Sequence, residues 1–241
     1  MAKKILLFIV EGPTDETALS TVFNRIFSSE LIRFHVIHGD LLTKDFITPD
    51  KITAEVNAQI KRFCGNIYKP IHFAGVVHLI DTDGAFIPEN AIVKDQSKGR
   101  AYPYYTDDAI LTHAPDSVID RNKRKRSNIL KLTGLQRIGG IPYQIYYFSC
   151  NLDHVLHGER NLTEDEKILK ARDFDLRYAD HPDAFIRLLK SAEILAPGDY
   201  RETWSYIQSG LLSLQRRSNV GLILPEIDHC VGTDALQKAD S

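Results

Sequence analysis

Two short acidic motifs in this chain have the residue types and the placement of a metal site. The first is residues 11–16 (EGPTDE), and the second is residues 81–84 (DTDG); each directly follows an apolar run. If both runs are strands of one parallel sheet, the motifs emerge at the same edge, and their carboxylates converge. The four carboxylates expected to converge are those of Glu11, Asp15, Asp81 and Asp83. Such groups repel and resist ionisation unless a cation lies among them. Their hard oxygen atoms suit Mg²⁺ or Mn²⁺, the metals typical of phosphoryl transfer and phosphodiester cleavage.

A run of positive charge lies between these motifs and the next apolar segment. Residues 121–131 carry six basic side chains and no acidic one. Next to a metal site, Lys and Arg would neutralise the phosphates of a nucleic acid and stabilise charge on the scissile phosphate. A solvated helix face is the commoner explanation of such a run, and the sequence leaves both open. The residues expected to bind substrate are Arg121, Lys123, Arg124, Lys125 and Arg126.

The elements that must position these motifs follow from the hydrophobic pattern. Residues 5–10 form a continuous apolar run, which indicates a strand covered on both faces. Apolar residues then recur at helical spacing from Ala18 to Phe27, and Thr14 is expected to cap that helix. Similar patterns predict strands at 34–38, 73–80 and 144–148, and a helix at 50–64. Strands that alternate with helices favour an α/β fold with a mostly parallel central sheet.

The rest of the chain departs from this alternation. Residues 84–118 are rich in turn formers and too long for a simple connection, so we expect a long insertion over about 84–130. Residues 1–158, including the insertion, are predicted to form the core domain, and residues 159–230 a helical extension packed on it. Helical patterns within that extension lie near 163–177, 181–194 and 200–215. The polar residues 231–241 are expected to be a flexible tail.

Three tyrosines of the insertion have two possible roles. Tyr102, Tyr104 and Tyr105 could stack on unpaired bases. Aromatic residues in such a segment more often anchor it to the body of the protein, and we favour that interpretation.

Composition narrows the class of protein. The 241 residues include 30 Lys and Arg against 32 Asp and Glu, a formal net charge of −2. This balance excludes a generally basic nucleic-acid binder but leaves room for a local basic patch. No stretch approaches the roughly 20 apolar residues of a membrane helix. The three cysteines are far apart and in no metal-ligand spacing. We therefore expect a cytoplasmic protein with reduced thiols and no membrane association.

The order of the two acidic motifs resembles a known family. An apolar strand ending in Glu-Gly-x-Thr-Asp-Glu, a helix, and a later strand ending in Asp-x-Asp resemble the topoisomerase–primase (Toprim) domain. With Asp15 four residues after Glu11, the first motif is most similar to that of OLD-type nucleases and related phage-defence Toprim proteins. The resemblance covers roughly residues 3–155. It implies a Toprim-like, Rossmann-related core.

The resemblance also implies roles for individual residues. Glu11, Asp81 and Asp83 would be catalytic, and together with Asp15 they would bind one or two metal ions. Asp153, after the fourth strand, loosely matches a further acidic position found in some relatives. The implied cofactor is Mg²⁺ or Mn²⁺.

Segments that other Toprim proteins carry are not found in this sequence. It has no Cys/His cluster of the kind that binds zinc in primases, and no Gly-x-x-x-x-Gly-Lys-[Ser/Thr] motif of an ATPase. The expected function is therefore an Mg²⁺-dependent nuclease that hydrolyses DNA or RNA. It would act alone or with a separately encoded ATPase subunit, and the resemblance suggests a role in defence against phage.

Two other functions fit the same residues. Asp81-Thr82-Asp83 also resembles the haloacid-dehalogenase signature, in which the first Asp is the nucleophile of a small-molecule phosphohydrolase. That signature normally follows the first strand of the chain, not the third. A Toprim subunit that binds nucleic acid or a partner protein without strong catalysis is the other alternative. Salt-sensitive binding without metal-dependent cleavage would indicate it.

Overall fold

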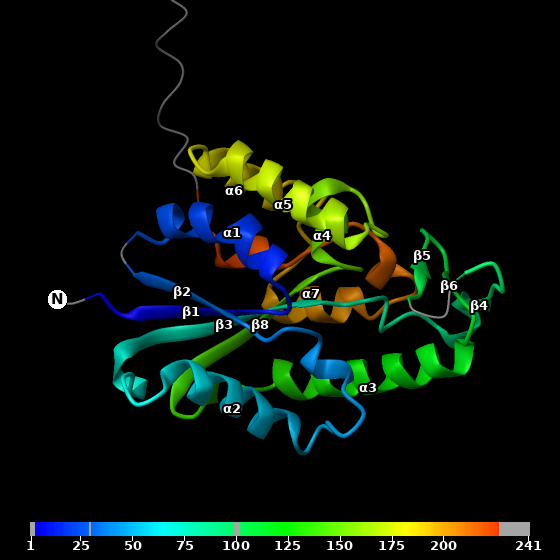
Figure 1. Ribbon diagram of the computed structural model, residues 1–241, viewed down its shortest axis with the longest axis horizontal. Coiled ribbons are helices and arrows are strands. Elements are labelled where there is room, and N and C mark those ends of the chain that lie inside the picture. Colours follow the sequence, from blue (N-terminus) through cyan, green and yellow to red (C-terminus); the bar gives the residue numbers. More distant parts are fainter. Residues whose placement is uncertain (1–2, 29, 99–101, 227–241) are drawn as a thin grey trace, which may run out of the picture.

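Four parallel strands form the centre of the computed structural model, which describes residues 3–28, 30–98 and 102–226 (Figure 1). The sheet order is β2-β1-β3-β8-β7. Its parallel members are β1 (Ile5–Val10), β2 (Leu31–Val36), β3 (Phe73–Asp81) and β8 (Ile141–Phe148). The short β7 (Arg137–Ile138) pairs antiparallel with the start of β8. The prediction of an α/β fold with a mostly parallel sheet is confirmed.

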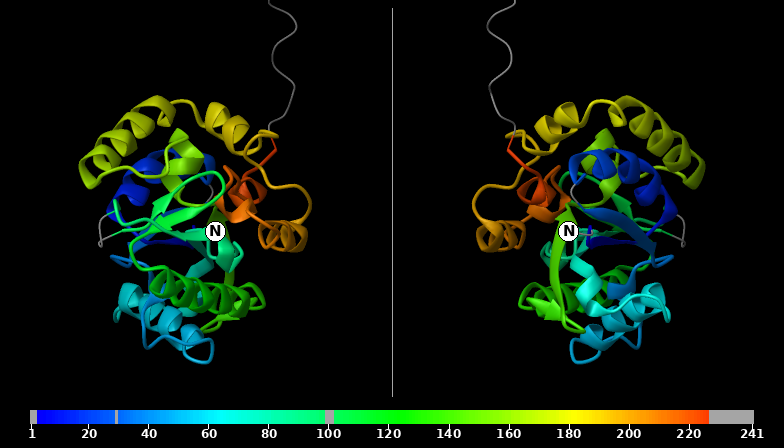
Figure 2. Two further views of the ribbon diagram at one scale, coloured as in Figure 1. Left: turned by 90° about the vertical axis from the view of Figure 1, so that its right-hand side faces the viewer. Right: turned by 90° about the vertical axis from the view of Figure 1, so that its left-hand side faces the viewer.

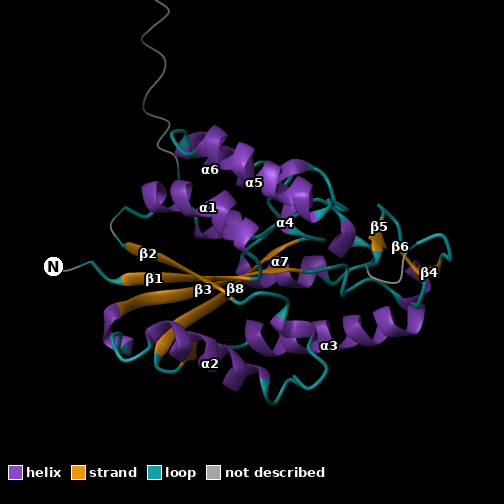
Figure 3. Ribbon diagram, viewed as in Figure 1, coloured by secondary structure: helices purple, strands orange, loops and turns teal. Residues whose placement is uncertain are grey.

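Helices cover both faces of this sheet (Figure 3). One face carries α2 (Ile52–Cys64) and α3 (Pro115–Thr133). The other carries α1 (Pro13–Ile26), α4 (Leu152–His157), α5 (Glu164–Tyr178) and α6 (Pro182–Leu189) (Figure 2). The period-two side-chain alternation of a strand explains this arrangement. In β1, Leu7 packs with the α2 and α3 residues, and Phe8 packs with those of α1 and α6.

The inserted segment forms a second, smaller sheet rather than one continuous loop. Its strands are β4 (Ile92–Lys94), β5 (Tyr104–Tyr105) and β6 (Ile110–Thr112), in the order β4-β6-β5. This small sheet lies beyond the carboxyl ends of the central strands (Figure 1). The basic run, by contrast, belongs to α3, a helix of 19 residues.

The region after β8 is helical and also completes the sheet edge. Besides α5 and α6 it contains α7 (Tyr200–Ile207). The described residues from 159 onward contain no named strand, but Ser149 N donates to Arg217 O at 2.7 Å, and Tyr147 N donates to Asn219 Oδ1 at 2.8 Å. Residues 217–219 therefore lie along the outer edge of β8. The tail predicted at 231–241 lies outside the described residues.

Several predicted boundaries are wrong. The N-cap of α1 is Gly12, not Thr14, because Pro13 occupies the first helical position and the Asp15 carboxylate accepts a hydrogen bond from Gly12 N at 2.9 Å. Strand β2 ends at Val36, because His38 has a positive φ of 52°. Helices α6 and α7 also end earlier than predicted, at Leu189 and Ile207. Among the described helices, none has the length and apolar character needed to cross a membrane.

Candidate active site

Acidic side chains follow three neighbouring strands at the same edge of the sheet. Glu11 comes directly after β1, Asp40 lies four residues after β2, and Asp81 is the last residue of β3. The strands are parallel, so their carboxyl ends meet there. Asp83 follows Asp81 in a tight turn, in which it has a φ of 48°.

Three of the predicted metal ligands line one small recess. Glu11, Asp15 and Asp81 surround it together with apolar residues of β1, β3, β8 and α4. Glu11 Oε1 accepts a hydrogen bond from Asp81 N at 3.4 Å, and Asp81 Oδ1 accepts one from Leu152 N at 2.8 Å. The carboxylates predicted from the two motifs are thus neighbours.

The electrostatics of this recess disfavour the charged state of its carboxyl groups. Burial raises the pKa of Asp81 well above its usual value, and the charges of Glu11, Asp15 and Asp83 raise it further. Burial likewise raises the pKa of Glu11 well above normal, although Lys125 opposes the shift, and burial raises the pKa of Asp15. The protein therefore supplies too little positive charge to hold all three carboxyl groups ionised, and a cation bound among them would favour their ionised forms.

A buried lysine neutralises the acidic groups that lie outside this recess. Lys125 Nζ donates to Asp40 Oδ2 at 2.7 Å, also pairs with Asp83 Oδ2, and lies 3.8 Å from Glu11 Oε1. Its side chain is 0% exposed. Burial alone would lower the pKa of Lys125, but Asp40, Asp83 and Glu11 together raise it well above normal. Burial alone would also raise the pKa of Asp83, but Lys125 and Arg121 hold it below normal.

A second layer of contacts fixes the turn at Asp83. Arg121 Nη2 donates to Asp83 O at 2.9 Å, and Arg121 Nη1 donates to Tyr105 Oη at 3.0 Å. Tyr105 Oη in turn donates to Asp83 Oδ1 at 3.4 Å. Asn161 holds β5 in place, because its amide exchanges two 2.8 Å hydrogen bonds with the Tyr105 backbone. The small sheet is therefore joined directly to the acidic cluster through Tyr105.

The five basic residues predicted to bind substrate do not share one surface. Arg121 and Lys125 face the acidic cluster. Lys123 is half-exposed and pairs with Glu89 at 2.9 Å, and Arg124 donates to Thr43 O at 2.7 Å. Arg126 is partly buried. Their contact with nucleic acid stays a prediction.

Asp153, the predicted metal ligand that matches the Toprim pattern least closely, lies in α4. It is 8% exposed, and its Oδ1 lies 3.9 Å from His157 Nε2. Burial raises its pKa to about 6, while Lys167 opposes the shift. The raised pKa means that ionised Asp153 destabilises the fold.

This shift predicts how stability depends on pH. The unfolded carboxyl ionises near pH 4 and the folded one near pH 6, so the destabilisation develops between these values and persists above them. We expect Asp153→Asn to be more stable than the wild type at pH 8, by up to about 3 kcal/mol for a shift of about two pKa units. The two proteins should converge below pH 4. Urea unfolding at pH 4, 6 and 8 measures this; a constant difference across the range would contradict the assignment.

The carboxylate oxygens of the recess are of the kind that binds Mg²⁺, although they do not form a complete set of ligands for the ion. Among the described residues, no group of three or more His, Cys, Asp or Glu is arranged to hold a metal ion. Mg²⁺ in phosphoryl-transfer sites is usually bound through one or two carboxylates, with water and substrate phosphate filling the other positions. Glu11 and Asp81 match that requirement in chemistry, because they are adjacent oxygen donors that line one small recess.

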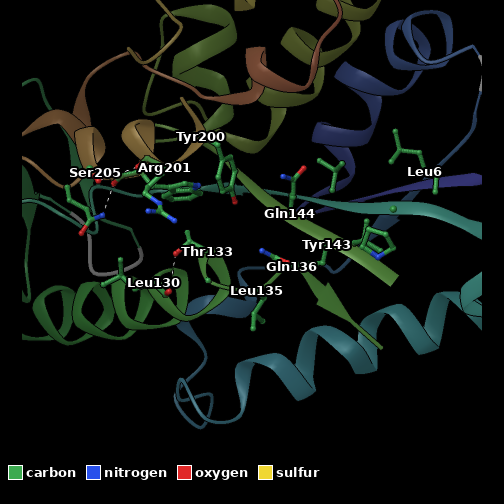
Figure 4. Close-up of a pocket in the computed structure, with 18 residues that line it drawn as sticks. Leu6, Leu130, Thr133, Leu135, Gln136, Tyr143, Gln144, Tyr200, Arg201 and Ser205 are labelled. Carbon is green, nitrogen blue, oxygen red and sulfur yellow. Dashed lines mark hydrogen bonds between the residues drawn. The ribbon is translucent and has the colours of Figure 1, made fainter. Parts of the chain in front are cut away.

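A larger groove lies elsewhere and has different chemistry (Figure 4). It has a volume of about 830 Å³ and is lined by the starts of β3 and β8, the end of α3, and α7. Figure 4 shows Gln136, Gln144 and Arg201 among its polar side chains. None of the described residues that line it is Asp, Glu, His or Cys, so this groove is not the metal site.

Comparisons with protein-family models, curated proteins and solved structures find no match to this chain.

Asp40 and Tyr105 were not assigned to the site from the sequence. Asp40 follows a predicted strand, but a plain turn explains the sequence His38-Gly39-Asp40 equally well. Tyr105 alternates with the more exposed Tyr104 on β5, so one of the pair faces the core. That two-residue strand is too short for a sequence pattern to reveal.

Proposed function

We propose that this chain is an Mg²⁺-dependent nuclease of the Toprim type that hydrolyses phosphodiester bonds in DNA or RNA. The observation that carries the proposal is the recess lined by Glu11, Asp15 and Asp81 at the carboxyl edge of the parallel sheet. Its carboxyl groups resist ionisation when no cation is present, and their oxygen atoms are the donors that Mg²⁺ prefers.

The roles of the individual side chains follow from their contacts. Glu11 and Asp81 would hold the ion, with Asp15 adding negative charge beside them. When bound, Mg²⁺ supplies a Lewis acid for the phosphate and lowers the pKa of a bound water. Leu152 N orients the Asp81 carboxylate through a 2.8 Å hydrogen bond. Arg121, partly buried against Asp83 and Tyr105, holds the turn that carries Asp83.

The small sheet supports a nucleic-acid substrate over a small phosphate ester. Tyr104 is 41% exposed, and Lys98 Nζ lies 4.0 Å from the centre of its ring. Tyr102 is 81% exposed. Aromatic rings next to lysine ammonium groups are suited to stacking unpaired bases and neutralising their phosphates. Tyr105, on the opposite face of the same strand, contacts Asp83, which places this surface next to the acidic cluster.

Tyr104→Ala tests this surface. We expect the variant to bind single-stranded oligonucleotides about tenfold more weakly, because stacking on an aromatic ring contributes ~1–3 kcal/mol per base. Fluorescence anisotropy in the presence of Ca²⁺, which does not usually support cleavage, measures the binding. Leu176→Ala, at an exposed position on α5, is the control and should bind as the wild type does. If Tyr104→Ala binds the oligonucleotide as tightly as the wild type does, this surface does not bind the substrate.

A cleavage assay tests the proposed function itself. Purified protein is incubated with single- and double-stranded DNA and RNA, with Mg²⁺ or Mn²⁺ and with chelator. We expect cleavage that requires the metal. Turnover of an aryl phosphate monoester with a trapped aspartyl-phosphate at Asp81 would instead indicate a phosphohydrolase. Salt-sensitive binding without cleavage would indicate a binding subunit. Repeating the assay with a separately encoded ATPase tests whether such a partner is required.

A further inference from the structure

The acidic edge of the sheet already contains one cation. The ammonium group of Lys125 contacts carboxylates that follow three different strands: Glu11 after β1, Asp40 after β2 and Asp83 after β3. These carboxylate side chains are 17%, 15% and 21% exposed, and Lys125 itself is fully buried. The lysine is therefore more deeply buried than the three carboxylates, and its ammonium group supplies them with a positive charge from within the protein.

The contacts of the carboxylate oxygens divide the acidic cluster into two pairs. Asp40 and Asp83 form the first pair, and Glu11 and Asp81 form the second. Asp40 Oδ1 accepts from Leu42 N at 2.8 Å, and its Oδ2 accepts from Lys125. Asp83 Oδ1 accepts from Tyr105 Oη, and its Oδ2 accepts from Lys125. Both oxygens of both carboxylates thus accept a hydrogen bond from the protein, and one oxygen of each faces the Lys125 ammonium, whose positive charge repels a second cation there.

The second pair, Glu11 and Asp81, has carboxylate oxygens that accept no hydrogen bond from the described residues. Within the described part of the chain, Glu11 Oε2 and Asp81 Oδ2 accept no hydrogen bond, and neither is a buried orphan atom. No basic nitrogen of a described residue lies within 4.0 Å of the Asp81 or Asp15 carboxylate. Asp81 and Asp15 therefore have no basic partner among these residues of the described chain, and the nearest one to Glu11 is Lys125 at 3.8 Å.

We propose that this site takes one divalent cation, at Glu11 and Asp81, and that Lys125 occupies the place of a second. The proposal rests on the proposed function for the presence of the first ion. A second dication at Asp83 would have to displace a fully buried ammonium group that three carboxylates hold. Asp83 is then a positioning residue for Lys125 rather than a metal ligand, in contrast to the role that the Toprim resemblance implies for it.

Counting bound Mn²⁺ tests this assignment without relying on cleavage. Isothermal titration calorimetry and electron paramagnetic resonance give the number of ions on the full chain for the wild type, Lys125→Met, Asp83→Asn and Asp81→Asn. We expect one ion on the wild type and two on Lys125→Met, because removal of the ammonium frees Asp40 and Asp83. Asp83→Asn should still bind one ion, whereas Asp81→Asn should bind it at least tenfold more weakly.

The outcomes separate the two proposals. Two ions on the wild type, one ion on a folded Lys125→Met, or loss of an ion in Asp83→Asn would each overturn the role of Lys125 and leave the metal-dependent nuclease intact. No ion on the wild type would overturn the metal dependence itself. If Lys125→Met does not fold, the counts on the wild type and on Asp83→Asn, which retains Lys125, decide the question. The expected counts without any cleavage would support this inference and overturn the proposed function.

Discussion

Asp81→Asn is expected to abolish metal-dependent cleavage, with a loss of at least about a hundredfold. The substitution is isosteric, and an Asn side-chain oxygen can still accept the hydrogen bond that Leu152 N donates to Asp81 Oδ1. What changes is the negative charge, which a divalent cation in this recess requires. The measurement is the initial rate of oligonucleotide cleavage at saturating Mg²⁺. Asp173→Asn, at an exposed position on α5, is the matched control and should cleave at the wild-type rate.

The same substitution is expected to stabilise the protein in the absence of metal. Burial and the charges of Glu11, Asp15 and Asp83 raise the pKa of Asp81, so the folded state resists an ionisation that the unfolded chain undergoes freely. The advantage of Asp81→Asn over the wild type should therefore grow as pH rises above about 4. A variant that loses activity and gains stability is typical of a site that is strained for function. A variant that keeps activity, or that unfolds more easily, would contradict the assignment of Asp81.

Lys125→Met should be the most destabilising of these substitutions, at about 3–5 kcal/mol. Removing one member of a buried ion cluster leaves the other charges without compensation. Glu11, Asp40 and Asp83 would then face each other with no cation among them. The single tryptophan, Trp204, is 4% exposed, so its fluorescence reports urea unfolding directly.

Lys123→Met is the matched control, two residues away on the same helix. Lys123 is 51% exposed and pairs with a Glu89 side chain that is 60% exposed, so its loss should change the unfolding free energy by less than about 1 kcal/mol. The deficit of Lys125→Met should shrink at low pH, where the three carboxylates can take up protons, and on addition of Mg²⁺. An equal effect of the two substitutions would mean that Lys125 does not neutralise the cluster.

The core of the fold was predictable because its strands are buried on both faces. β1 and β3 are nearly continuous apolar runs, and they appear as strands at almost the predicted residues. The limits of other elements depend on contacts that a local pattern does not contain. The cap of α1, for example, depends on how Pro13 and Asp15 fit together at the first turn.

The site was predictable only in its acidic half. Residues at the carboxyl ends of parallel strands must share an edge, and Glu11, Asp15 and Asp81 do line one recess. The position of Lys125 was not predicted, because a run of basic residues looks like a solvated surface. A helical signal was nevertheless present: Lys125 lies on the same buried stripe of α3 as Val118, Ile129 and Leu132. A charge on an apolar stripe requires a buried partner, and the acidic motifs could have supplied one.

The turn that carries Asp83 also depends on a segment far along the chain. Ser213 O accepts hydrogen bonds from Thr82 Oγ1 and Cys150 N, each at 3.0 Å, and Ser218 Oγ donates to Tyr147 O at 2.7 Å. During synthesis on a ribosome, the strands and every acidic residue of the site emerge before these partners do. The nascent chain would therefore hold an open sheet edge and an unsupported turn at Asp83 until residues 212–219 leave the exit tunnel. Assembly of the acidic site should therefore be among the last events of folding, and a partly made chain would not yet carry it in its final form.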